Sequence, residues 1–161
     1  MLKNILLATF AVLLIGCTNN IVVTTPQKLS KIHKDATIAL FRLENYTDTP
    51  RAGMRAANIL EGLLKAKGYK VVSNINTKTY SFKKAAKKAQ AEHAQYFIYG
   101  GVSEWRYKTG IDGEPAVSIQ LSLYKTADQQ LIWSATGSDS DWGNGSIGTT
   151  AQDLLMEMIR G

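Results

Sequence analysis

The chain opens with a short apolar run that ends just before its only cysteine. The run extends from Ile5 to Ile15, with Thr9 as its polar interruption, and Lys3 gives the preceding segment a positive charge. A helix that crosses a bilayer takes about 20 apolar residues, so this run is typical of the core of a secretory signal peptide. The remainder must then fold outside the cytoplasm. With Cys17 as the single cysteine, no disulfide within the monomer can hold that fold together.

The residues around the cysteine resemble the lipobox of bacterial lipoproteins. The small residue Gly16 precedes Cys17, which signal cleavage would leave as the first residue, ready for acylation. An ordinary signal with an incidental cysteine is the alternative, but the only cysteine falls where a lipobox requires it. Each buried methylene contributes about 0.8 kcal/mol, so several acyl chains on Cys17 anchor firmly. Because Thr18 follows rather than Asp, the sequence resembles lipoproteins that are sorted to the outer membrane of Gram-negative bacteria.

The sequence divides into three parts on this basis. Residues 1–16 form the signal peptide, 17–35 the lipidated N-terminus and tether, and 36–161 one folded domain. The tether is rich in Thr, Asn, Lys and Ser and lacks periodicity, although its apolar Ile21-Val22-Val23 could dock on the domain. The formal net charge is +6, or +5 once Lys3 is removed. A basic balance could attract anionic lipid or polymer, and it says nothing about the fold.

The domain alternates strand and helix patterns in the order β-α-β-α-β-β-β-α. Strands are predicted at 36–43, 69–75, 96–107, 116–124 and 131–136, and helices at about 50–67, 82–94 and 147–160. Thr49, Ser81 and Ser146 are the predicted helix N-caps. The strand-helix-strand start predicts a parallel pair with a right-handed crossover, whereas the clean alternation over 116–124 favours an antiparallel strand covered on one side. The fold class is therefore α/β, a sandwich of helices packed on a mixed sheet.

Carboxylates lie near the predicted strand ends and turns. The candidates are Glu104, Asp112, Glu114, Asp139 and Asp141. They could face a passage and attract ammonium groups. The alternative, which residue types alone favour, is that Asp112-Gly113 is a common turn pair and that Glu104 pairs with Arg106 or a lysine.

A tryptophan and a lysine-rich helix are the other surface candidates. Trp142 precedes Gly143-Asn144-Gly145 and has no apolar neighbours in sequence, so it fits either a membrane interface or a lid over the sheet edge. Lysines line one side of the helix predicted at 82–94, with Ala86, Ala89 and His93 on the other. That lysine face could meet anionic headgroups, but a solvated helix face is the commoner explanation.

Nothing in the sequence favours catalysis. His33 lies in the tether and His93 on a helix, so no histidine pair for zinc is apparent, and no nucleophile-elbow or phosphate-loop pattern appears. A glycosidase would need two acids within about 5 to 10 Å, such as Glu104 with Glu114 or Asp112, and the sequence cannot give that distance. We therefore expect a non-enzymatic protein with no cofactor, no metal and no nucleic-acid partner.

Three blocks of sequence resemble the PelC family. They are 44–53 (ENYTDTPRAG), 103–117 (SEWRYKTGIDGEPAV) and 131–137 (LIWSATG). Members of this family are outer-membrane lipoproteins of Pel exopolysaccharide export. More distantly, the pattern is similar to the periplasmic domains of curli-secretion lipoproteins and of penicillin-binding-protein activators.

The resemblance implies a role in building the biofilm matrix. It implies a homo-oligomeric ring, a dodecamer in the family, beneath a PelB-like outer-membrane β-barrel exporter. The ring would guide a partly cationic amino-sugar polymer along an electronegative surface while Trp142 dips into the membrane. Because the net charge is positive, the acids must then segregate from the lysines. The alternative is a lipoprotein that activates a cell-envelope enzyme such as a peptidoglycan synthase, for which a tether of 18 residues, about 60 Å when extended, is short.

Overall fold

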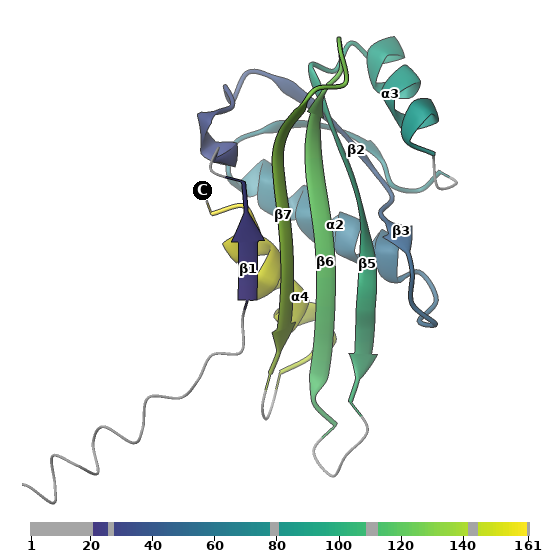
Figure 1. Cartoon of the computed structure of the whole chain (residues 1–161), viewed down its shortest axis with the longest axis vertical. Helices are drawn as coiled ribbons and strands as arrows, with labels where there is room; N and C mark the ends of the chain where they lie inside the picture. The colour runs from purple at the N-terminus through teal and green to yellow at the C-terminus, as the bar shows by residue number, and fades with distance from the viewer. Residues whose placement is uncertain (1–20, 26–27, 78–80, 109–112, 142–144, 161) are drawn as a thin grey trace, which may run out of the picture.

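One mixed sheet organises the domain (Figure 1). The computed structural model describes residues 21–25, 28–77, 81–108, 113–141 and 145–160. Its strands are β1 (Ile21–Thr24), β2 (Thr37–Phe41), β3 (Glu44–Asn45), β4 (Lys70–Asn74), β5 (Tyr96–Tyr107), β6 (Pro115–Lys125) and β7 (Leu131–Ser140). Its helices are α2 (Ala52–Ala66), α3 (Phe82–Ala91) and α4 (Ile147–Met158), with a short 3-10 helix, η1 (Leu29–Lys31). The mixed α/β class and the predicted element order are confirmed.

The sheet joins a parallel half to an antiparallel half. Its strand order is β1-β7-β6-β5-β2-β4, with β3 also paired to β5. The parallel pair predicted around α2 is present as β2 and β4, and β2 also pairs in parallel with β5. The strands β5, β6 and β7 are antiparallel neighbours. Helix α2 therefore connects two parallel strands, and the C-terminal half is a meander of long strands.

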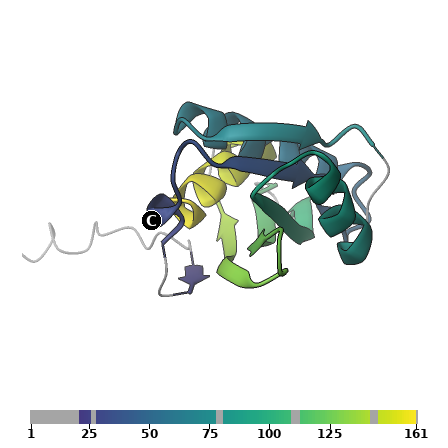
Figure 2. The same cartoon turned by 90° about the horizontal axis from the view of Figure 1, so that it is seen from above.

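Each face of the sheet carries its own apolar core. Helices α2 and α4 pack on one face and on each other, and the core between them and the sheet includes Leu60, Leu154 and Trp133. On the opposite face (Figure 2), the small residues of α3 pack against Ala39, Phe41 and Phe97, near one end of the long strands (Figure 1). Beyond α3, this second face carries hydrophilic side chains from β5, β6 and β7, such as Ser118, Gln120, Thr136 and Ser138.

The predicted helix starts have mixed outcomes. Ser146 caps α4 as predicted, because its Oγ accepts from Thr149 N at 3.2 Å while Thr149 Oγ1 accepts from Ser146 N at 2.9 Å. The prediction of Thr49 as the N-cap of α2 is wrong. The helix begins at Ala52, after Arg51 in a left-handed conformation (φ 62°), and Thr49 Oγ1 instead donates to the Trp105 carbonyl at 2.5 Å.

The second predicted helix is shorter than expected. Ser81 holds the N-cap position of α3, as predicted, but its side chain makes no capping hydrogen bond. The helix ends at Ala91, and His93 follows with φ 55°. The prediction that His93 shares the apolar face of this helix is therefore wrong, since the residue is exposed.

Part of the segment expected to be a tether is folded. Strand β1 pairs antiparallel with β7, Ile21 opposite Ser138, so the apolar residues that could dock do so at a sheet edge. Leu29 is fully buried, and its carbonyl accepts from the Tyr69 hydroxyl at 3.0 Å. The folded region thus begins well before residue 36. Residues 1–20, including the predicted signal peptide and Cys17, lie outside the described residues.

Candidate functional site

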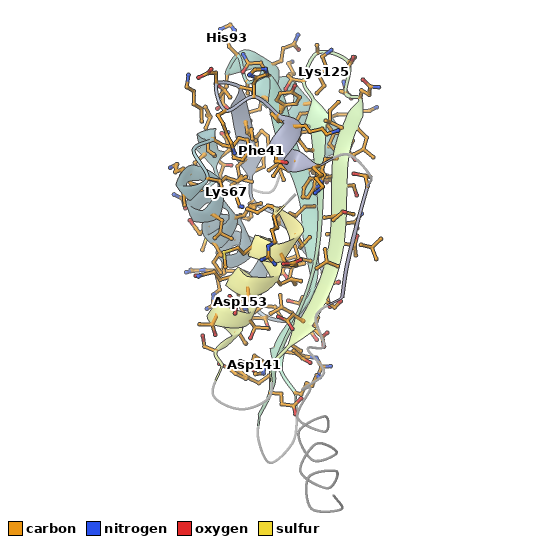
Figure 3. The ribbon with its side chains drawn as sticks, turned by 90° about the vertical axis from the view of Figure 1, so that its left-hand side faces the viewer. Phe41, Lys67, His93, Lys125, Asp141 and Asp153 are labelled. Carbon is orange, nitrogen blue, oxygen red and sulfur yellow. The ribbon has the colours of Figure 1, made fainter. Side chains whose placement is uncertain are left out.

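The two ends of the long strands differ in chemistry. We call the end where β5 and β7 finish and β6 begins the loop end. Tyr107 pairs with Pro115, Ala116 with Ser140 and Ile21 with Ser138, so these strand ends lie together. They are the described residues next to the segments 1–20, 109–112 and 142–144. Asp141 and Asp153 lie at the loop end, while His93 and Lys125 lie at the other (Figure 3). The 12 residues of β5 at about 3.3 Å each put roughly 40 Å between the ends.

An acidic group occupies the loop end. Burial raises the pKa of the Asp139 carboxyl above its ordinary range, and the nearby carboxylates of Asp141 and Asp153 raise it further, against a hydrogen bond from the Ser140 backbone. Asp141 lies against Gly145, where a Cβ would overlap its carboxylate. Asp139 and Asp141 are thus brought together. Sequence reasoning missed Asp153, because only the docking of α4 on β7 places it here and no local pattern signals it.

The raised pKa of Asp139 makes stability depend on pH. A group whose pKa is higher in the folded than in the unfolded state stabilises the fold below its unfolded pKa, and this contribution is lost as pH rises through the folded pKa. Ionisation of Asp139 therefore opposes folding. We expect Asp139→Asn to raise the Tm at pH 7 and to match the parent below about pH 3, where Asp139 is protonated in both states. Thermal unfolding across this range measures the difference.

A matched control separates this effect from a general loss of negative charge. Asp35 is 93% exposed and lies 3.7 Å from Lys70, and exposed pairs of this kind contribute about 0–1 kcal/mol. Asp35→Asn should leave the Tm at pH 7 unchanged or slightly lower. An Asp139→Asn protein that is no more stable than its parent at pH 7 would contradict the burial argument.

The two glutamate candidates are paired with cations. The Glu104 carboxylate accepts from Arg106 Nη2 at 2.9 Å and Nε at 3.0 Å, which is the pairing that residue types favour. Glu114 lies 3.5 Å from Lys108. Glu114 is still at the loop end beside Asp141, whose backbone N donates to the Pro115 carbonyl at 3.3 Å. Glu104 lies three residues before the end of β5, at the level of Ser138, but on the sheet face away from α2 and α4.

Two candidates remain unplaced. Asp112 and Trp142 lie outside the described residues, although their neighbours Gly113, Asp141 and Gly145 are at the loop end. Within the described ranges, no group of three His, Cys, Asp or Glu side chains is placed to hold a metal ion. Among the same residues, no helix is long and apolar enough to cross a membrane.

A groove that sequence reasoning missed runs beside β3 and β5. Its volume is about 480 Å³, and its lining residues are Tyr46, Thr47, Asp48, Thr49, Ser103, Glu104, Trp105, Arg106 and Ser118. Most of them belong to the segments 44–53 and 103–117, on which the family resemblance rests. The family resemblance of the two segments was the signal that the sequence offered. Only the pairing of β3 with β5 in the folded chain brings the segments to one groove.

Comparisons with known proteins agree with this architecture. No protein-family model matches the sequence, and no curated protein sequence matches it either. Among solved structures, the PelC dodecamer from Paraburkholderia phytofirmans is 31% identical, with a TM-score of 0.76 over 87% of this chain and 94% of that one. Lipoprotein GNA1162 from Neisseria meningitidis has a TM-score of 0.55 at 17% identity, over 78% of this chain and 99% of that one.

The fold also resembles the C-terminal domain of LpoB from Salmonella enterica. That match has a TM-score of 0.51 at 17% identity, over 67% of this chain and 84% of that domain, and like the Neisseria match it shows the fold alone. The chain is thus one of the small α/β domains with helices packed on an open mixed sheet. Within this class, the identity and coverage of the Paraburkholderia match show that the chain belongs to the PelC family.

Proposed function

We propose that this chain is a lipid-anchored outer-membrane protein that forms a ring on the periplasmic side. The ring guides a Pel-like amino-sugar exopolysaccharide to an outer-membrane exporter, without catalysis. The observation that carries this proposal is the 31% identity to a PelC dodecamer over 87% of the chain. The geometry of the loop end supports it independently.

The loop end is the end that faces the membrane in this proposal. Cys17 precedes Ile21 by four residues, a reach of about 14 Å at most. Ile21 is fixed to β7 opposite Ser138, so an acyl group on Cys17 keeps the loop end close to the bilayer. Trp142, between the described Asp141 and Gly145, then belongs to the same membrane-proximal end. Helix α3 packs on Phe97, near the opposite end of β5, which disfavours contact of its lysines with that bilayer.

The acids near the membrane suit a cationic polymer. Asp139, Asp141 and Asp153 gather at the loop end although the chain as a whole carries a formal +6, and Glu114 lies there paired with Lys108. A concentration of carboxylates at one end of the domain is what guidance of ammonium groups requires of a basic protein. A polymer that passes the acids would do so just before it reaches an exporter in the outer membrane.

The same short link disfavours the activator alternative. An activator that works on an inner-membrane synthase must reach across the periplasm from its lipid. Since β1 begins four residues after Cys17, the free link spans about 14 Å, far less than the 60 Å expected for an unfolded tether. The domain therefore stays beside the outer membrane.

The mass of the lipidated protein in detergent tests ring formation. A closed ring has one mass that persists on dilution, because each copy uses both halves of a head-to-tail interface. We expect a single species near twelve times the mass of the mature chain, as in the PelC dodecamer. Multi-angle light scattering corrected for detergent measures this mass over a hundredfold range of concentration. A clean monomer at the highest concentration would overturn the proposal.

A further inference from the structure

Tyr46 forms an aromatic platform on the surface of the sheet. Its side chain is 72% exposed, and its backbone N donates to the Val102 carbonyl at 2.9 Å. Its ring lies over Gly101, where a Cβ would come within 2.5 Å of Tyr46 Cε2. Glycine at 101 therefore lets the ring rest directly on β5 with its other side toward solvent.

The loop that carries Tyr46 is ordered by its own hydrogen bonds, without a ligand. Asn45 Oδ1 accepts from Thr47 N at 3.1 Å and from Thr47 Oγ1 at 2.8 Å, and Asn45 Nδ2 donates to the Thr49 carbonyl at 2.9 Å. The bond from Thr49 to Trp105 then ties the loop to β5. A site that is already ordered loses less entropy on binding, so this arrangement favours recognition.

The groove is acidic within a basic protein. Arg106, the cation among its lining residues, is held by Glu104. Asp48 is exposed and takes part in none of the ion pairs among the described residues. The lining therefore carries one excess negative charge, although the whole chain carries +6. An anionic ligand is disfavoured here, and a cationic one is attracted.

Hydroxyl groups complete the lining. Thr47, Ser103 and Ser118 contribute them beside the aromatic ring and the carboxylates. The volume of about 480 Å³ is in the range of small-molecule sites, about 300–1,000 Å³. An aromatic face attracts an ammonium group, a carboxylate makes a charge-assisted hydrogen bond with it, and hydroxyls match the hydroxyls of a sugar. This combination fits a ligand that is a cation and a polyol at once.

We infer that this groove is a binding subsite for an amino-sugar unit of the polymer. The sugar lies on the Tyr46 ring, its ammonium group pairs with Asp48, and its hydroxyls bond to Thr47 and Ser118. This inference rests on the proposed function, which it deepens by placing a polymer contact on the sheet face away from α2 and α4. It adds a site that is separate from the acidic group at the loop end.

Saturation-transfer difference NMR titration of the lipidated protein in detergent tests this inference, because the method detects weak binding of a small ligand to a large assembly. The probes are the β-1,4-linked hexamers of glucosamine, which is cationic, and of N-acetylglucosamine, which is neutral. We expect the glucosamine hexamer to bind more tightly. Tyr46→Ala should weaken its binding about tenfold, since a cation on an aromatic face contributes about 0.5–2 kcal/mol. Asp48→Asn should weaken the glucosamine hexamer at least about threefold and leave the neutral hexamer unchanged.

A second tyrosine on the same strand provides the control. Tyr107 is 52% exposed at the end of β5 and lies outside the groove. Tyr107→Ala should bind both hexamers as the parent does, and Tyr46→Phe should retain most of the binding because the ring is kept. The inference is overturned if the parent binds neither hexamer, or if Tyr46→Ala binds as tightly as the parent.

The ring mass and the membrane fractionation of the same proteins distinguish failure of the subsite from failure of the proposed function. If the Tyr46→Ala ring dissociates while the parent ring is intact, Tyr46 is a contact between copies and the subsite is rejected. If the parent protein forms the ring in the outer membrane but binds no amino sugar, the subsite is rejected and the proposed function stands. If the parent is a monomer, the proposed function is rejected whatever the sugar titration gives.

Discussion

A Gly53→Ala protein is expected to lose about 3 kcal/mol of folding free energy, the upper part of the range for overpacked sites. Gly53 lies in the first turn of α2, where a Cβ would come 2.0 Å from the Leu43 carbonyl oxygen and 2.8 Å from its carbon. Both atoms belong to the backbone between β2 and β3, so no change of rotamer can relieve the contact. The start of α2 would have to move away from the sheet, and urea unfolding measures the cost.

The same helix supplies the matched control. Gly62 is also inside α2, but a Cβ there would meet nothing within 4 Å. Replacing an exposed helical glycine by alanine stabilises by about 0.5–1 kcal/mol, so Gly62→Ala should be slightly more stable than the parent. Two identical substitutions nine residues apart in one helix then have opposite signs. Equal stability of the two variants would contradict the close approach of α2 to Leu43.

The strands and the C-terminal helix were predictable because their signals are local. The bounds of β5 match the prediction at both ends, and the inward face of α4 follows from the spacing of Ala151, Leu154, Leu155 and Met158, which are all buried. Strand β7 is longer than predicted. Its last residues, such as Ser138 and Ser140, are small and polar, and their pairing with β6, together with that of Ser138 with β1, makes them a strand.

Elements that depend on distant partners were missed. The local sequence predicts that the Thr49 hydroxyl caps α2. Instead, this hydroxyl donates to the Trp105 carbonyl, 56 residues further along the chain. The two residues of β3 carry no strand pattern and owe their conformation to β5. For the same reason the groove could not be predicted, because the sequence does not give the distance between the segments 44–53 and 103–117.

Of all single substitutions, loss of the proposed lipid anchor at Cys17 is expected to change the location of the protein most. Under the proposed function, Cys17→Ser removes the thiol that would carry the acyl chains, and with it the buried methylenes that contribute about 0.8 kcal/mol each. Since the apolar run at 5–15 could hold an uncleaved chain at the inner membrane, the variant is expressed behind a signal peptide whose cleavage does not need the cysteine. We expect it to move from the outer-membrane fraction to the soluble periplasm, with most polymer export lost.

Folding should not change in this variant, because the first strand begins four residues after the substitution and its pairing with β7 does not involve residue 17. An unchanged Tm therefore shows that loss of export comes from loss of position and not from unfolding. Thr18→Ala, which leaves the thiol in place, should remain in the outer-membrane fraction and support export. A Cys17→Ser protein that fractionates with the outer membrane and exports polymer normally would mean that protein contacts hold the domain there. The short link between lipid and sheet would then have no role in placing the loop end.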